Sequence, residues 1–354
     1  MRNPLEWWEQ RRARQRYMPR VRKEKTGRTA RVAALSLVVI IAAAALLEFR
    51  RGGGSESELV ELARESGREA LELVEEAARS RRLIFLSDIP TAPAPKRFAE
   101  QAIERIALGS GLDMVVLAID SDEQPYIDRY LATSPEDPSI LLSRPRAVRE
   151  GDGAARVFLD VYRTVWRVNE QLGAARRVRI VAADAPGWPP ARATSPADAA
   201  TQFAERADHM MTAVMDRALG RNPGARVFFL VDGLHALKSG GGRVQTGGAA
   251  PATMNWLAAQ LRERFPAEVF SILVDAAPSR SISPDVVAYR GTAYGAVLRR
   301  GGLSAGTALR VTDTFDDVSR NPVRTAGTTG VDFSFEPRAV PMTDLADAYI
   351  FFGT

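Results

Sequence analysis

Residues 225–238, ARVFFLVDGLHALK, contain the strongest indication of the fold of this chain. Residues 227–231 form an unbroken apolar run, with Asn-Pro-Gly before it and Asp-Gly after it. Such a run predicts a strand that is buried on both faces, as in a parallel sheet. In open α/β sheets, ligands bind beyond the carboxyl ends of the strands. His235 follows such an end and is therefore the first candidate for a functional side chain.

Four other short apolar runs each lead into an aspartate. They are residues 83–86, 114–119, 178–183 and 269–274, followed by Asp88, Asp120, Asp184 and Asp275. If the strands are parallel, these carboxylates gather at one edge of the sheet. The alternative is that each aspartate only caps the helix that follows its strand.

Helical patterns fill the gaps between these runs, at Pro95–Leu108, Glu123–Leu131, Ala154–Leu172, Ala197–Leu219 and Pro251–Phe265. Strands that alternate with helices of this length predict right-handed crossovers. The expected fold is therefore α/β, with a mainly parallel sheet and helices on both faces. The glycine-dense residues 239–248 are either a flap over the sheet edge or a plain surface loop, and they match no phosphate-binding motif.

The charge and the cysteine count exclude several classes of function. Cysteine is absent, which excludes disulfides, thiolate nucleophiles and cysteine-ligated metals. Residues 1–31 contain eleven Lys or Arg against three Glu, a net +8, while the rest of the chain contains 37 basic and 40 acidic residues. The basic character therefore belongs to a tail, and the main domain has no charge pattern that indicates nucleic-acid binding.

Residues 32–47, VAALSLVVIIAAAALL, carry no charge and directly follow the basic tail. As a helix they span about 24 Å at 1.5 Å per residue, less than the ~30 Å hydrocarbon core, but Phe49 extends the apolar stretch. We expect an uncleaved single-pass anchor at 32–49; the alternatives are a buried core helix and a cleaved signal peptide. The excess of Lys and Arg before it predicts a cytoplasmic tail at 1–31 and an extracytoplasmic main domain at 83–354 in the cell membrane.

Residues 50–82 link the expected anchor to the main domain. Gly52–Gly54 form a flexible joint, and Ser55 with Glu58 forms a capping box at the start of a helix. The apolar spacing up to about Arg82 predicts either a stalk helix or a helix packed on the domain.

Several short motifs, in this order along the chain, resemble a known superfamily. They are Leu86-Ser87-Asp88-Ile89-Pro90, Asp120 followed by Gln124-Pro125, Arg206-Ala207-Asp208-His209-Met210, Gly233-Leu234-His235, and a last strand at 347–352. The arrangement is similar to the superfamily of ChaN-type haem-uptake proteins, erythromycin esterases and Tiki/TraB metalloprotease-like proteins. The resemblance covers roughly residues 83–274 and the terminal strand.

This resemblance implies a site with some of its usual groups replaced. In the enzymatic relatives, a glutamate and a histidine after the first strand act as metal ligand or general base, and here Asp88 and Pro90 occupy those positions. The retained groups, Asp88, Asp120 and His235, are candidate catalytic residues, and the same three are candidate ligands of a divalent metal such as Mg²⁺, Mn²⁺ or Zn²⁺. Candidate ligand-binding residues are Asp184, Trp188, Arg206 and Tyr126.

Three functions follow as hypotheses. The first is a membrane-anchored extracytoplasmic domain that binds a small planar ligand, with haem as the cofactor that the resemblance implies; Trp188 would stack on it, unless this tryptophan only packs on its own core. The second is an esterase or metal-dependent hydrolase that uses the remaining aspartates and His235. The third is a non-catalytic membrane scaffold that binds other proteins.

Overall fold

In the computed structural model, the chain divides into two compact units, residues 1–53 and 54–354. The residues that the structure describes all belong to the second unit. They are 56–89, 92–144, 158–186, 211–233, 235–239, 242–245, 252–254, 256–276, 288–289, 293–311, 325–326, 332–335 and 342–353.

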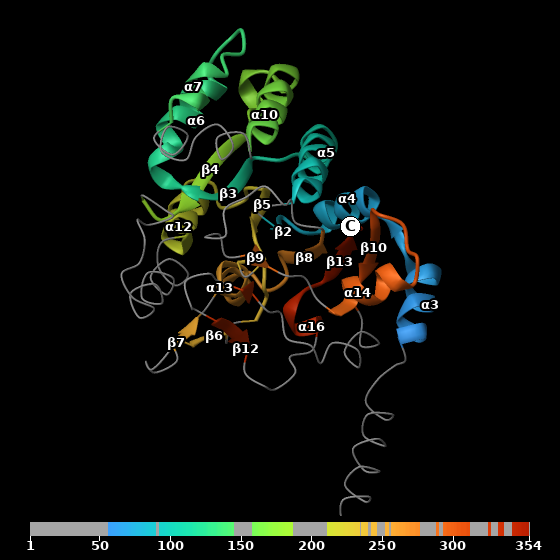
Figure 1. Cartoon of the computed structure of the whole chain (residues 1–354). Helices are drawn as coiled ribbons and strands as arrows, with labels where there is room; N and C mark the ends of the chain where they lie inside the picture. Colours follow the sequence, from blue (N-terminus) through green and yellow to red (C-terminus); the bar gives the residue numbers. More distant parts are fainter. Residues whose placement is uncertain are drawn as a thin grey trace, which may run out of the picture. The chain divides into compact units, whose positions relative to one another are not determined.

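An eight-stranded sheet organises this unit, in the order β1-β10-β13-β8-β2-β5-β3-β4 (Figure 1). The six strands from β13 to β4 are parallel, while β10 pairs antiparallel with β13 and with β1. The bounds are β1 Arg68–Glu69, β2 Leu83–Asp88, β3 Met114–Asp120, β4 Arg179–Asp184, β5 Val227–Asp232, β8 Val269–Asp275, β10 Thr307–Arg310 and β13 Ala348–Phe351. The prediction of a mainly parallel α/β sheet is confirmed, and the sheet is mixed because β10 runs antiparallel to both of its neighbours.

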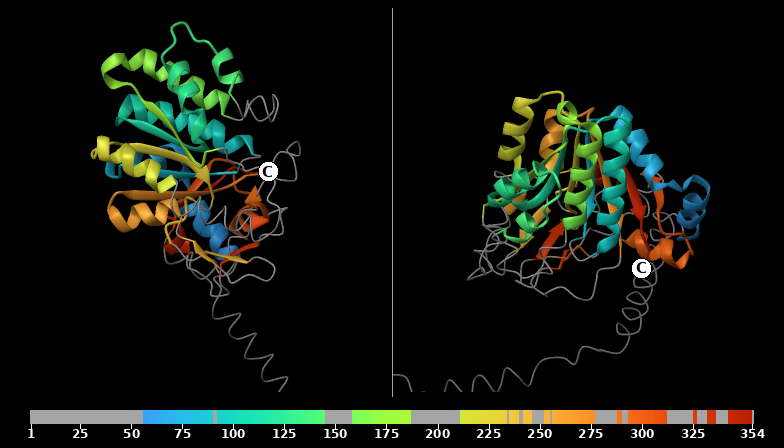
Figure 2. Two further views of the ribbon diagram at one scale, coloured as in Figure 1. Left: turned by 90° about the vertical axis from the view of Figure 1, so that its left-hand side faces the viewer. Right: turned by 90° about the horizontal axis from the view of Figure 1, so that it is seen from above.

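Helices connect the parallel strands. They are α5 (Pro93–Gly109), α6 (Gln124–Leu131), α7 (Ser139–Leu142), α10 (Leu159–Leu172), α12 (Met211–Arg221) and α13 (Leu257–Arg264). From β2 through β3 to β4 the chain moves toward one side of the sheet, and from β4 through β5 to β8 it moves back. Because crossovers are right-handed, this reversal places α12 and α13 on the face opposite α5 and α10. Accordingly, α5 contacts α10 and α12 contacts α13 (Figure 2).

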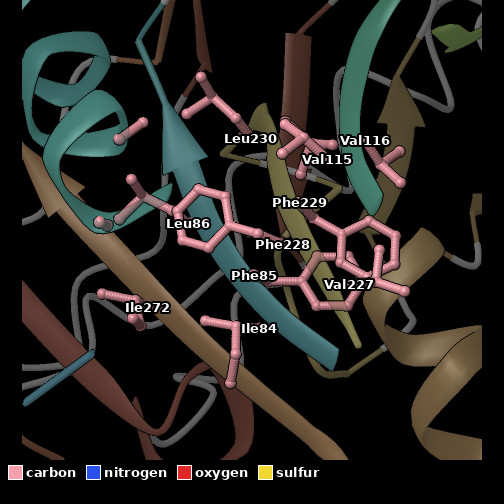
Figure 3. Close-up of a cluster of buried hydrophobic side chains, with 14 of the residues drawn as sticks. Ile84, Phe85, Leu86, Val115, Val116, Val227, Phe228, Phe229, Leu230 and Ile272 are labelled. Carbon is pink, nitrogen blue, oxygen red and sulfur yellow. The ribbon is translucent and has the colours of Figure 1, made fainter. Parts of the chain in front are cut away.

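The core lies along the central strands, whose side chains are buried on both faces. Phe85 of β2 and Phe229 of β5 stack with their ring centroids 3.9 Å apart and their planes 3° apart. Figure 3 shows this pair among the aliphatic side chains of the neighbouring strands. Burying one such side chain contributes roughly 1.5–3 kcal/mol to the stability of the fold. The packing of these strands therefore also fixes where their carboxyl ends lie.

Two helices precede the first parallel strand. They are α3 (Glu56–Ser66) and α4 (Ala70–Ser80), separated at Gly67, where an added Cβ would lie 2.2 Å from the carbonyl oxygen of Ala63. The buried face of α4, including Leu73 and Val74, belongs to the hydrophobic core. Of the two expectations for residues 50–82, the structure has helices packed on the domain, and the compact unit begins at Gly54.

The C-terminal third adds elements that the apolar pattern does not reveal. A second, antiparallel sheet has the order β7-β6-β12-β11-β9, with β6 Gly242–Gln245, β7 Ala252–Met254, β9 Ala288–Tyr289, β11 Thr325–Ala326 and β12 Asp332–Phe335. Within the glycine-dense stretch, Gly242–Gln245 form the paired strand β6. The remaining helices are α14 (Ala293–Arg300) and α16 (Met342–Leu345). The expected last strand is present as β13, parallel to β8.

Among the described helices, none is both long and apolar enough to cross a membrane. The expected anchor at 32–49 and the basic tail at 1–31 lie outside the described residues.

Candidate functional site

Five neighbouring parallel strands each end in an aspartate at the same edge of the sheet. In sheet order these are Asp275, Asp88, Asp232, Asp120 and Asp184. Asp88 lies in register with Asp232, and Asp120 with Asp184. The expected gathering of strand-end acids is therefore present, whereas their roles in function stay predictions.

The connections diverge at the carboxyl ends of β2 and β5, which are neighbours in the sheet. The chain leaves β2 toward α5 and leaves β5 toward α13, which lie on opposite faces of the sheet. Such a topological switch point is where open α/β sheets bind ligands. The side chains nearest to it are therefore the first to consider.

His235 lies on the tight turn that follows β5, next to these strand ends. Its backbone NH donates to the carbonyl oxygen of Asp232 over 3.0 Å, and its Nε2 lies 3.6 Å from Oδ2 of Asp232. The ring of Trp256 meets the imidazole edge to face, with centroids 5.5 Å apart. The His235 side chain is 1% exposed, while that of Asp232 is 27% exposed. The turn thus places an imidazole beside a carboxylate that solvent can reach.

Sequence reasoning missed Asp232 as a member of the site. The signal was available, because Asp232 ends its strand in the same way as the four aspartates that were singled out. His235, three residues later, is the more conspicuous polar side chain after this strand and conceals that signal.

Asp88 forms a buried ion pair with Lys96 of α5. Lys96 Nζ lies 2.8 Å from Oδ1 of Asp88 and also donates to the carbonyl oxygens of Ile89, at 3.2 Å, and Ala92, at 3.3 Å. Burial raises the pKa of Asp88, Lys96 works against that rise, and the nearby charge of Asp232 adds to it. Asp88 and Asp232 are thus electrostatically coupled, so a change of charge at one acts on the other.

Lys96 was also missed, although the helix carries a signal for it. Its neighbours on the buried stripe of α5 are apolar, among them Phe98, Ala99 and Ile103. A lysine on such a stripe must have an anionic partner, since lysines are almost never fully buried unless paired. The strand-end Asp88 was the available anion.

Asp120 and Asp184 accept local backbone hydrogen bonds. Oδ1 of Asp120 accepts from the NH of Asp122 at 2.8 Å and so caps the short helix Ser121–Glu123, and Oδ1 of Asp184 accepts from the NH of Ala185 at 2.8 Å. Asp120 therefore caps the helix that follows its strand, which is the alternative role considered for the strand-end aspartates. Tyr126 packs against the hydrophobic core from α6.

Asp275 has partners of its own, Tyr349 and Arg299. Tyr349 donates its hydroxyl to Oδ2 of Asp275 at 3.1 Å, and the guanidinium of Arg299 lies 3.8 Å away. Burial raises the pKa of this carboxyl, and the Tyr349 hydrogen bond and Arg299 oppose that rise. Gly295 leaves the space that the carboxyl fills, because a Cβ there would overlap Oδ2.

The remaining expectations for the site have different outcomes. Among the described residues, no three His, Asp or Glu side chains form a group that could hold a metal ion, so Asp88, Asp120 and His235 do not constitute such a group here. Trp188, Arg206 and Pro90 lie outside the described residues. A hollow of about 430 Å³ on the described surface lies between α3 and residues 302–307, and none of the strand-end aspartates lines it.

Comparison with known proteins identifies the fold. No protein-family model matches the chain, and no curated protein does. Among solved structures, an erythromycin esterase variant in its open conformation has a TM-score of 0.51 at 10% identity, over 79% of this chain and 92% of that one. A Bacillus cereus protein has a TM-score of 0.57 at 10% sequence identity, and the match covers 85% of this chain and 98% of that one. A succinoglycan biosynthesis protein has a TM-score of 0.53 at 8% identity, and the match covers 84% of this chain and 97% of that one. The resemblance drawn from the sequence motifs is thereby confirmed at the level of the fold.

Proposed function

We propose, from the erythromycin esterase fold of this chain, that its second unit hydrolyses carboxylic esters, with His235 as the general base. The observation that carries this proposal is the pair of His235 and Asp232 at a topological switch point, with Nε2 3.6 Å from Oδ2. Hydrogen bonds of catalytic groups are often long in the absence of substrate and shorten in its complex. A carboxylate beside the imidazole orients it and stabilises the cation that forms during the reaction.

The reaction needs one proton to pass from the attacking water to His235 and from His235 to the leaving alcohol oxygen. A water molecule gives a proton to the ring nitrogen of His235 that does not face Asp232, as the water oxygen forms a bond to the ester carbonyl carbon. The carbon–oxygen bond to the alcohol then breaks, and the imidazolium returns the proton to the leaving oxygen. Asp232 remains ionised throughout and faces the positive ring.

The test is an ester-hydrolysis assay with full-length chain in mild detergent, with p-nitrophenyl butyrate and erythromycin as substrates. We expect His235→Gln to lower kcat by about 10²–10⁴-fold, the usual contribution of a positioned acid or base. His209→Gln, which replaces the other histidine of the chain, is the matched control and should retain activity. Equal rates for the wild type and His235→Gln would reject the proposal.

A ligand-binding domain without catalysis is the second candidate. The observation that favours it is the burial of the candidate catalytic groups, because a general base must meet a water molecule. The His235 side chain is 1% exposed, and Asp88 is 3% exposed. The planar ligand that the sequence resemblance implies is haem, and titration with hemin tests it through the Soret band. A spectrum equal to that of free hemin would reject haem as the ligand.

We infer in addition that residues 32–49 anchor the chain in the cell membrane, with the tail 1–31 in the cytoplasm. The uncharged run and the eleven Lys and Arg before it support this orientation. The test is membrane fractionation followed by protease treatment of intact cells or spheroplasts, with a tag at each end of the chain. We expect the protein to leave the membrane fraction only when detergent is added, and the protease to remove the C-terminal tag alone. Release of the protein by carbonate without detergent would contradict the anchor.

A further inference from the structure

The turn that carries His235 is hydrogen-bonded to a helix and to a strand of the main sheet. The backbone NH of Ala258, in α13, donates to the carbonyl oxygen of His235 at 3.0 Å. The hydroxyl of Ser271, in β8, donates to the carbonyl oxygen of Ala236. The turn is therefore held by a helix and by a strand that are distant from it in the sequence.

Lys238 supplies the strongest tie, at the end of the same turn. Its side chain is 8% exposed, and Nζ lies 2.6 Å from Oδ1 of Asp347. Its backbone NH donates to the carbonyl oxygen of Leu345 at 3.0 Å. Because a buried ammonium without its carboxylate is costly, this pair strongly restricts where the turn can lie.

Asp347 in turn is fixed to the main sheet. Its Oδ2 accepts from the backbone NH of Ser271 at 2.8 Å, and its own NH donates to the carbonyl oxygen of Ser271 at 2.8 Å. Asp347 directly precedes β13, the strand that pairs with β8. Lys238 therefore connects the His235 turn to the seam between these two parallel strands.

We propose that Lys238 and Asp347 are positioning residues that hold the His235 imidazole beside Asp232. The contact between Nε2 and Oδ2 is 3.6 Å, and a displacement of about 1 Å at such a contact can cost on the order of 10²-fold in rate. Lys238 lies three residues after His235, so loss of its anchor frees the backbone that carries the ring. The catalytic part of this inference rests on the proposed ester hydrolysis, and the placement of the ring does not.

A second buried ion pair provides a matched control. Arg144 Nη1 lies 2.8 Å from Oε2 of Glu123, and both side chains are at most 5% exposed. None of the hydrogen bonds of the His235 turn described above involves this pair. Arg144→Met therefore resembles Lys238→Met in its cost to stability, but it should leave the imidazole in place.

The placement of the ring can be measured directly, because the chain has two histidines. In a His209→Gln background, the ¹³C-labelled imidazole of full-length chain in detergent micelles gives signals from His235 alone. We expect Lys238→Met to shift these signals and to remove their nuclear Overhauser effect to the Trp256 ring. Lys238→Arg keeps the positive charge, so it should leave the imidazole signals and their nuclear Overhauser effect as in the wild type. Arg144→Met should likewise change neither. If Lys238→Met does not fold, Asp347→Asn breaks the same pair with a smaller change in volume.

Kinetics provide the second measurement. Lys238→Met should lower kcat by about 10²-fold with little change in KM, since it moves the base and leaves substrate contacts intact. An unchanged His235 signal in Lys238→Met would overturn the positioning role, whatever the activity. An inactive wild type would instead reject the ester hydrolysis, and the imidazole signal would then decide the positioning role by itself.

Discussion

At the scale of single residues, the buried pair of Asp88 and Lys96 makes the sharpest prediction about stability. Lys96→Met leaves the Asp88 carboxylate buried without its cation, and Asp88→Asn leaves the ammonium without its anion. Each single change should cost about 3–5 kcal/mol of unfolding free energy, while the double change should cost much less than their sum. Urea unfolding of the four proteins measures this, and single changes that cost less than ~1 kcal/mol would contradict the pairing.

Asp275 makes a prediction about pH. Its pKa is raised in the folded protein, chiefly by burial. A carboxyl of this kind stabilises the fold most below its unfolded pKa, and that contribution is lost as the pH rises through the folded value. The stability of Asp275→Asn relative to the wild type should therefore increase between about pH 4 and pH 7, the range above the ordinary Asp value. Unfolding in urea at several pH values measures the difference, with the exposed carboxyl variant Glu104→Gln as control; no change in relative stability would contradict the burial effect.

Residues of the candidate site at strand ends could be predicted from the sequence, whereas those that depend on a contact between distant elements could not. Asp88, Asp120, Asp184 and His235 were found because a strand end is visible in the sequence as a switch from apolar to polar residues. Lys96 was not found, because its partner comes from another element and only the fold brings the two together. The apolar stripe of the helix does mark Lys96 as buried. A lysine on such a stripe can therefore be predicted to pair with an aspartate at the end of a neighbouring strand.

At the scale of elements, Gln124 explains how the edge strand β4 is completed. Its Nε2 donates to the carbonyl oxygen of Ile180 at 2.8 Å, and its Oε1 accepts from the NH of Ala182 at 2.8 Å. Both backbone groups lie on β4, which has a neighbouring strand on one side alone within the described sheet. The side chain thus takes the place of a neighbouring strand at these two positions.

Removing this side chain should loosen β4. Gln124→Ala leaves two backbone groups without their partner, so we expect a loss of about 1–3 kcal/mol and faster hydrogen exchange at the Ala182 amide. Gln101→Ala, on the exposed face of α5, should change stability by no more than ~0.5 kcal/mol. If the Ala182 amide exchanges equally fast in both variants, Gln124 does not protect the strand.

The elements also differ in how far they could be predicted. The five parallel strands that were predicted, β2, β3, β4, β5 and β8, match their apolar runs to within about two residues, because their buried residues show no polar alternation to interrupt the pattern. The short strands β6, β9, β11 and β12 contain two to four residues and no apolar run, so their pairing depends on distant chain segments. Short length and non-local pairing therefore mark the limit of this approach.

At the scale of the whole molecule, strand order determines which acids become neighbours. Strand β5 follows β4 in the sequence but lies between β2 and β3 in the sheet, and this order brings Asp232 into register with Asp88. The sequence predicted a common edge for the strand-end groups, but it contained no information about their order along that edge. Strand order comes from long-range packing, so the sequence alone does not reveal that Asp88 and Asp232 are neighbours.

A double-mutant cycle on Asp232 and His235 tests the central claim most directly. The kcat/KM for p-nitrophenyl butyrate is measured for the wild type, Asp232→Asn, His235→Gln and the double variant. If the two side chains act as one unit, the double variant should be about as slow as His235→Gln alone, because catalytic residues that work together are strongly non-additive. Losses that multiply in the double variant would show that the two side chains act independently and would contradict the proposed site.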